Sequence, residues 1–135
     1  MESKPIGQTK AVGFQVGVRR TFPISQEKAW ELVTSAEGFE LWLGLNTSLI
    51  LKPGQAYIAK TGAGELRVVK PLEQLRLTWK KDEWHKPSTV QIRFIPKEHN
   101  KTTISFHQEN LPNQNVREEM KEYWENVLEE LRVRF

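Results

Sequence analysis

Two polar residues of this chain, Arg20 and Gln108, are placed where they could act inside the protein. Each lies in an alternating stretch whose neighbours of the same parity are apolar, so each is expected to point inward. A buried guanidinium needs a partner, because removing a charge from water is costly. Arg20 could orient the polar head of a ligand, or it could pair with a carboxylate at the edge of a sheet. Buried charges are usually paired, which favours the structural alternative.

Catalytic side chains do not form a recognisable set in the sequence. No serine can be combined with an inward-facing histidine, and the chain has no Gly-rich phosphate loop. Acid–base chemistry on a bound ligand could use Tyr57, Arg20 or Glu65, but no pattern singles these residues out. The sequence leaves enzymatic activity undecided and favours a protein that is not an enzyme.

Metal and cofactor binding are not predicted. The chain contains no cysteine, and His85, His99 and His107 do not stand at ligand spacing with another histidine or a carboxylate. The glutamates near the C-terminal end follow a helical spacing that is typical of a solvated face. These residues are Glu118, Glu119, Glu122, Glu125, Glu129 and Glu130. We therefore expect no metal site and no cofactor.

Length and charge place the chain among single-domain proteins. It has 135 residues and a net charge of +3, with Lys and Arg interleaved with Glu. Nucleic-acid binding needs a clustered basic stripe, so no nucleic-acid partner is predicted. No apolar run approaches the roughly 18 residues of a membrane span, and no secretory signal is recognisable. The predicted location is cytoplasmic, without a membrane partner.

The hydrophobic periodicity predicts an α+β fold with an unusual order of elements. Residues 1–12 lack periodicity and are interpreted as a mobile leader before a domain at 13–135. Alternation over residues 14–22 predicts the first strand. Ser25 is a natural helix N-cap, and two short helices are expected between it and Leu43.

The middle of the chain predicts a run of antiparallel strands. Residues 49–51 and 56–58 are expected to form a hairpin around the Pro53–Gly54 turn, because this order suits a type II turn. A second turn is predicted at 61–64, followed by strands at 65–70, 75–79, 90–94 and 104–106.

One long amphipathic helix is predicted for residues 115–135. Asn115 is expected to be its N-cap, with Glu118 three residues later as in a capping box. About twenty residues at 1.5 Å each would span about 30 Å, which is enough to cross a sheet.

This ordered set of residues resembles the START-like, helix-grip superfamily, the fold of the birch pollen allergen. It is most similar to the family named for the homologue of the activator of the 90-kilodalton heat-shock-protein ATPase. The resemblance covers residues 12–135 and rests on Arg20, Phe22, Trp30, Thr34, Trp42, Pro53–Gly54, the strand 75–79, the end of the last strand at 103–111 and Trp124. Many members carry a histidine where this chain has Gln108.

The resemblance implies a curved antiparallel sheet of about six or seven strands that grips the C-terminal helix. Members of the superfamily often enclose an apolar cavity between the sheet and this helix. The residues expected to line it are Phe22, Trp42, Leu77, Trp79, Ile92, Phe94, Ile104, Phe106, Gln108, Met120, Trp124 and Val127, with Arg20 as a candidate polar anchor. A close-packed core is the alternative, because periodicity does not separate the two.

Three functions follow from the resemblance. The leading hypothesis is a non-enzymatic carrier or sensor of a small apolar molecule. The alternatives are a co-chaperone-like module that binds a chaperone in the stress response, and an enzyme of the cyclase or hydrolase kind. An exposed apolar patch outside the cavity would favour the protein partner. A converging polar triad inside it would favour the enzyme.

Overall fold

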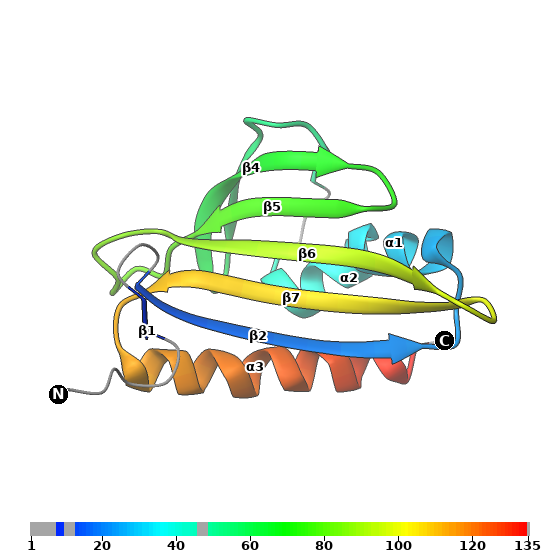
Figure 1. Cartoon of the computed structure of the whole chain (residues 1–135). Helices are drawn as coiled ribbons and strands as arrows, with labels where there is room; N and C mark the ends of the chain where they lie inside the picture. The colour runs from blue at the N-terminus through cyan, green and yellow to red at the C-terminus, as the bar shows by residue number, and fades with distance from the viewer. Residues whose placement is uncertain (1–7, 10–12, 46–48, 135) are drawn as a thin grey trace, which may run out of the picture.

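The structure is a computed structural model that describes residues 8–9, 13–45 and 49–134. A curved antiparallel sheet packs against a long C-terminal helix, with two short helices inserted after the first long strand (Figure 1). The predicted helix-grip fold is confirmed. The elements are β1 (Gln8–Thr9), β2 (Gly13–Phe22), α1 (Gln26–Thr34), α2 (Ala36–Leu43), β3 (Ala56–Ala59), β4 (Gly62–Lys70), β5 (Gln74–Trp79), β6 (Ser88–Lys97), β7 (Lys101–Leu111) and α3 (Gln114–Arg132).

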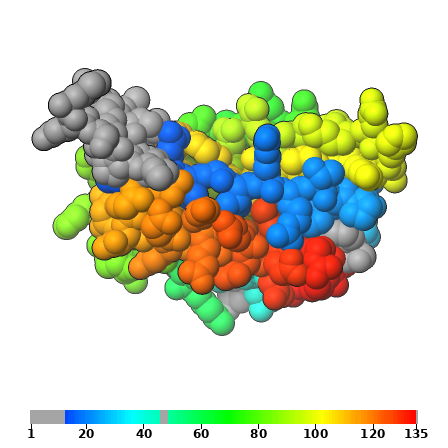
Figure 2. Space-filling model, turned by 60° about the horizontal axis from the view of Figure 1, so that its bottom comes forward, coloured from blue at the N-terminus to red at the C-terminus, as the bar shows by residue number. Residues whose placement is uncertain are grey.

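The sheet has the strand order β1-β2-β7-β6-β5-β4-β3, and every pair is antiparallel. The first long strand therefore lies beside the last one, with Arg20 opposite Ile104. The remaining strands follow as consecutive hairpins, as short links favour. The strand β3 ends the sheet at one edge, and β2 with the two-residue β1 ends it at the other. Figure 2 shows α3, in orange to red, lying along β2, in blue.

The two short helices are separated by a single serine. Ser25 accepts the Lys28 N–H at 3.1 Å, which confirms the predicted N-cap of α1. Ser35 ends α1 by donating its N–H to Glu31, and its Oγ then accepts the Gly38 N–H at 3.0 Å to begin α2. Because one residue serves both ends, the turn between the helices is as short as possible.

The long helix begins two residues earlier than predicted. Its N-cap is Asn113, whose Oδ1 accepts the Val116 N–H at 2.9 Å, and not Asn115. Asn113 has the extended backbone of an N-cap residue, with φ −162° and ψ 176°. Both asparagines suit a cap chemically, so the end of the preceding strand decides between them.

The predicted strand at residues 49–51 is wrong. The Lys52 N–H bonds to Ile50 O at 2.9 Å, which bends the backbone where the strand was expected. The turn that follows does form, with Gln55 N–H bonded to Lys52 O and a φ of +88° at Gly54. The strand β3 pairs with β4 and is the edge strand of the sheet, so residues 49–51 do not form a hairpin with it.

The predicted turn at 61–64 is also wrong in part, because β4 begins at Gly62. Glycine is needed here since β4 passes very close to β5. A Cβ on Gly64 would lie 1.9 Å from Thr78 O, and one on Gly62 would lie 2.4 Å from Trp79 Nε1. These glycines therefore mark a close approach of two strands, which sequence reasoning mistook for a turn.

Most of the predicted leader, residues 1–7 and 10–12, lies outside the described residues. Gln8 and Thr9 form β1 and pair with Phe14 and Gly13.

Replacing Gly64 with alanine should lower the free energy of unfolding by about 1–3 kcal/mol, because the added methyl group overlaps the β5 backbone. Gly17→Ala is the matched control: it is also in a strand of the sheet, and its Cβ would meet His107 Cδ2 at an ordinary 3.5 Å. The control should change stability by less than about 0.5 kcal/mol. Urea unfolding of both variants measures the difference, and equal stabilities would contradict this account of the strand crossing.

Candidate functional site

Four aromatic side chains fill the space between the sheet and α3. Trp42, Trp79, Phe106 and Trp124 come from α2, β5, β7 and α3, and each is fully buried. Trp124 stacks on Phe106 with ring centroids 4.8 Å apart and planes at 15°. Its ring also lies 5.8 Å from Trp79 and 6.4 Å from Trp42. We call these four residues the aromatic cluster; its members meet at the separations of a packed core.

A chain of buried hydrogen bonds runs beside the aromatic cluster. Trp124 Nε1 donates to Gln108 Oε1 at 2.9 Å, and Gln108 Nε2 donates to Ser88 Oγ at 2.9 Å. Ser88 Oγ in turn donates to the backbone oxygen of Trp79 at 2.6 Å. Gln108 thus joins α3 to two strands and satisfies groups that would be costly to bury unpaired. The sequence predicted an inward Gln108 but gave no signal for Ser88.

Two tyrosine hydroxyls connect other elements. Tyr123 OH donates to Trp42 O, joining α3 to α2, and Tyr57 OH donates to Thr78 O, joining β3 to β5. Burial raises the pKa of Tyr123 to about 12 and raises the pKa of Tyr57 further above its usual value. Both phenols are therefore neutral donors near pH 7, so the proton of Tyr57 is committed to a backbone oxygen.

The structure brings the other predicted ligand-lining residues onto the same inner faces. Their side chains are at least 96% buried and belong to one hydrophobic core. They are Phe22, Leu77, Ile92, Phe94, Ile104, Met120 and Val127. That they line a ligand site stays a prediction.

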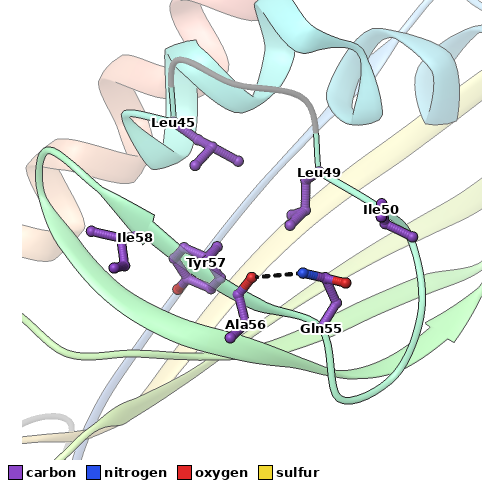
Figure 3. A pocket seen from close by; sticks show the side chains of 7 residues that line it. All are labelled: Leu45, Leu49, Ile50, Gln55, Ala56, Tyr57 and Ile58. Atoms are coloured by element: carbon purple, nitrogen blue, oxygen red, sulfur yellow. Dashed lines mark hydrogen bonds between the residues drawn. The ribbon is translucent and has the colours of Figure 1, made fainter.

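A concave site lies at the edge of this core, between Leu45, residues 49–50 and the edge strand β3 (Figure 3), and its lining residues Leu45 and Tyr57 belong to the core as well. It has a volume of about 440 Å³. We call it the β3 groove; it is lined by Leu45, Leu49, Ile50, Gln55, Ala56, Tyr57 and Ile58. Ile50 and Ile58 stand at opposite ends of the labelled set and are 66% and 85% exposed.

Two hydrogen bonds, one from a backbone N–H and one from a side-chain hydroxyl, hold the β3 groove in place. Lys60 N–H donates to Gly44 O at 3.1 Å, and Thr61 Oγ1 donates to Leu43 O at 2.7 Å. The C-terminal end of α2 is thereby bonded to the β3–β4 turn. Sequence reasoning missed this groove because it assigned residues 49–51 to a strand. The available signal was the apolar run at 49–51 and the nearby Ile58. The run does not alternate with polar residues, so a strand with one buried face would leave part of it exposed.

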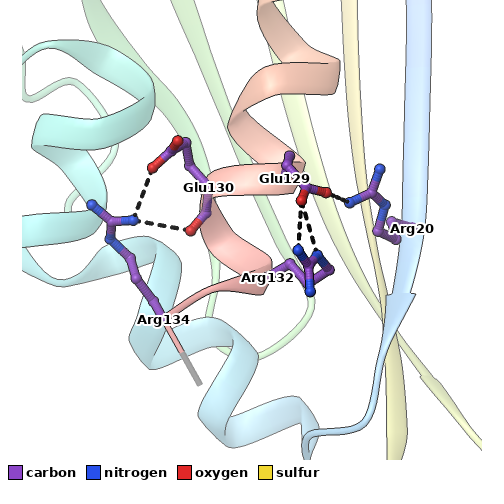
Figure 4. A network of polar contacts seen from close by, with 5 residues as sticks. All are labelled: Arg20, Glu129, Glu130, Arg132 and Arg134. Carbon is purple, nitrogen blue, oxygen red and sulfur yellow. Dashed lines mark hydrogen bonds and ion pairs between the residues drawn. The ribbon is translucent and has the colours of Figure 1, made fainter.

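Arg20 takes part in an ion-pair network at the rim of the sheet (Figure 4). Arg20 Nη1 lies 2.7 Å from Glu129 Oε2, and Arg132 Nη2 lies 2.6 Å from Glu129 Oε1. Hydrogen bonds from Arg132 and Arg20 lower the pKa of Glu129 to about 2. The Arg20 side chain is 39% exposed and joins β2 to α3. It therefore pairs with a carboxylate, as the structural alternative expected, and its role as a ligand anchor stays a prediction.

Replacing Gln108 with methionine should lower the free energy of unfolding by about 1–3 kcal/mol, because the Trp124 N–H loses its acceptor while the side-chain volume is kept. Gln91→Met is the control: Gln91 points away from α3, and its side chain accepts a bond from Gln74 Nε2 at 3.1 Å on the half-exposed outer face, where water can replace it. It should cost less than about 0.5 kcal/mol. The Trp124 indole proton, followed by NMR, should also shift in the Gln108 variant. An unmoved indole resonance would contradict the observed hydrogen bond.

Comparisons with known proteins identify the relatives of this fold. The family model described as Activator of Hsp90 ATPase homolog 1-like protein matches residues 23–135. No curated protein sequence matches the chain. CalU16 from Micromonospora echinospora superposes with a TM-score of 0.75 at 17% identity, covering 87% of this chain and 71% of CalU16.

Two further solved structures are named as an HSP90 activator and as an Aha1 dimer. PFC0360w, an HSP90 activator from Plasmodium falciparum, has a TM-score of 0.70 at 21% identity and covers 82% of this chain and 86% of its own. The Aha1 dimer from Colwellia psychrerythraea has a TM-score of 0.65 at 13% identity, covering 87% and 92%. At these identities the similarity shows the fold alone. None of the described helices is long and apolar enough to cross a membrane.

Proposed function

Because the chain belongs to the family of proteins similar to the activator of Hsp90 ATPase homolog 1, we propose that it is a co-chaperone-like module that binds a 90-kilodalton heat-shock ATPase. The contact surface in this proposal is the β3 groove. The observation that carries it is an exposed apolar surface outside the sheet–helix interior, flanked by Ile50 and Ile58. Such patches on a small domain are typical of protein contacts.

The distribution of exposed apolar residues supports this choice. In the described part of the chain, the large apolar residues with high exposure are Ile50, Ile58 and Val133. Two of these three flank one groove, and the third lies just beyond α3. Single exposed apolar residues are ordinary, but a pair beside a concave apolar surface resembles the centre of an interface.

The charges beside the β3 groove favour a particular kind of partner surface. Lys52 and Lys60 are exposed next to it, and the groove lining contains no acidic residue. A partner that presents an apolar side chain beside carboxylates would match both features. The name of PFC0360w as an HSP90 activator gives independent support for the class of partner.

Replacing Ile58 with glutamate should weaken binding to a 90-kilodalton heat-shock ATPase about tenfold, because it puts a charge at the contact surface. Isothermal titration with the purified chaperone measures the affinity, and the ATP hydrolysis rate of the mixture reports stimulation. Val133→Glu is the matched control, because it makes the same change at a residue that is 61% exposed and away from the groove. The control should bind like the unchanged protein. Equal affinities for both variants, or no binding by the unchanged protein, would refute the proposal.

A second candidate function is the binding of a small apolar molecule among the residues that face the aromatic cluster. The observation that favours it is Trp79 Nε1, a fully buried donor without a hydrogen-bond partner among the described residues. Buried donors are normally satisfied, so a ligand oxygen that reached this position would gain a hydrogen bond. Apolar burial at about 25 cal/mol per Å² would supply the rest of the affinity. Since the described side chains already occupy this space, α3 would have to move to admit the molecule.

Met120→Trp should weaken binding of an apolar ligand while keeping the fold, because it adds bulk where α3 faces the sheet. Overpacking of this kind costs about 1–3 kcal/mol of stability. NMR spectra with a panel of apolar small molecules test this: resonances of α2, the inner sheet face and residues 120–127 should move together. A panel that moves none of these resonances, or moves those of the outer sheet face, would exclude this candidate.

A further inference from the structure

The outer face of the sheet, which points away from α3, carries a basic hollow of about 350 Å³. It lies where β2, β7 and β6 run side by side. Its lining residues are Arg19, Arg20, Thr21, Ile95, Lys97 and Thr103. Three of the six are cationic and none is acidic. This hollow is separate from the β3 groove, which lies at the opposite edge of the sheet.

The strand register fixes how these residues are arranged. Thr21, Thr103 and Ile95 form one row across β2, β7 and β6, and Arg19, Ser105 and Arg93 form the next row on the same face. Neighbouring strands are about 4.8 Å apart, so the two arginines start about 10 Å apart on either side of β7. Arg93 does not line the hollow, but its positive charge on the same face adds to the positive potential beside it.

Two of the three cations that line this hollow, Arg19 and Lys97, have no carboxylate partner among the described residues, whereas the third, Arg20, pairs with Glu129. In the described residues, Arg19, Arg93 and Lys97 form no ion pair and no side-chain hydrogen bond. By contrast, Arg76 on the same face pairs with Glu109 at 3.4 Å, and Arg20 pairs with Glu129. The unpaired groups retain all their donors for a ligand.

Two threonine hydroxyls add a neutral donor at the bottom of the hollow. Thr21 Oγ1 and Thr103 Oγ1 are 2.6 Å apart, and Thr103 is only 4% exposed. One hydroxyl donates its proton to the other. The hydroxyl that accepts still has its own proton, which is not used in the bond between the two threonines. That proton can point toward a bound oxygen atom.

We propose that this hollow binds a phosphate group, and we call Arg19, Thr21, Lys97 and Thr103 the outer-face phosphate site. Guanidinium forks bind two oxygens at once, an ammonium acts as a point charge, and the hydroxyl reaches a third oxygen. A tetrahedral dianion presents three acceptor oxygens on one side, whereas a planar carboxylate presents two. The set of donors therefore matches phosphate better than a carboxylate. This inference does not depend on the proposed chaperone contact.

Titration of the labelled full-length protein with inorganic phosphate tests the site, at constant ionic strength set with sodium chloride. The Nε–Hε resonance of Arg19 and the amide of Thr103 should shift and saturate together. Arg19→Gln should weaken phosphate binding about fivefold, as expected for an exposed charge-assisted contact. Thr103→Val, which removes a hydroxyl at nearly constant volume, should weaken it as well. Circular dichroism checks that each variant is folded.

Arg67→Gln is the matched control, because it removes one positive charge from an arginine on β4 that is paired with Glu65. It should bind phosphate like the unchanged protein. If Arg67→Gln and Arg19→Gln weaken binding equally, or if the shifts spread over all basic side chains, the phosphate follows net charge and the site is overturned. Saturation with chloride alone would also overturn it.

The source of the phosphate group is resolved with two further ligands. Tighter binding of a nucleoside triphosphate than of inorganic phosphate would identify a small-molecule ligand. Tighter binding of a short phosphoserine peptide would identify a modified protein segment. Either result supports the site if the tighter binding is lost in Arg19→Gln and kept in Arg67→Gln. If the protein binds neither ligand, the site is contradicted.

Discussion

The stacking of Trp124 on Phe106 is the contact on which the rest of this structure depends. It places α3 at a fixed depth and rotation, because the same indole must also donate to Gln108. A helix fixed at one residue has its neighbours fixed about 100° apart, so Tyr123 is directed toward the Trp42 carbonyl. One residue pair on α3 thus connects β7, α2 and the buried polar chain, and a change in the stacking would disturb all three.

With the interior packed in this way, the two concave surfaces described above lie on the outside of the molecule. Fully buried rings occupy the space between the sheet and α3, and the rim beside them is held by Arg20, Glu129 and Arg132. The well-defined hollows considered above lie at the β3 edge and on the outer sheet face instead. A ligand in the interior would have to displace packed aromatic side chains, whereas a partner at the β3 edge meets Ile50 and Ile58 already exposed.

The sequence predicted the parts of the fold that local periodicity determines. Alternation gave the inward direction of Phe106 and Gln108 correctly, and Ser25 was recognised because an N-cap needs only its own helix. The main errors concern contacts between distant segments: Gly62 and Gly64 are needed because another strand passes close by, and from the sequence a turn explains these two glycines equally well. The apolar run at residues 49–51 was a signal for an exposed surface, but the position of Leu49 and Ile50 against β3 is again a contact between separate segments, so the shape of the β3 groove did not follow from the sequence.

The modest net charge conceals a separation of charge between two faces. The helix α3 contains six glutamates against three basic residues, so the rest of the chain must hold a larger positive excess than the +3 of the whole protein. Part of that excess lies on the outer sheet face, where Arg19, Arg93 and Lys97 have no carboxylate partner within the described chain. In the sequence, basic and acidic residues are interleaved, so this separation is not visible there. It becomes visible in the fold because alternate residues of a strand point to opposite faces of the sheet. Charge in a strand must therefore be counted by face, and counted this way the outer sheet face and the exposed side of α3 present opposite signs to a partner.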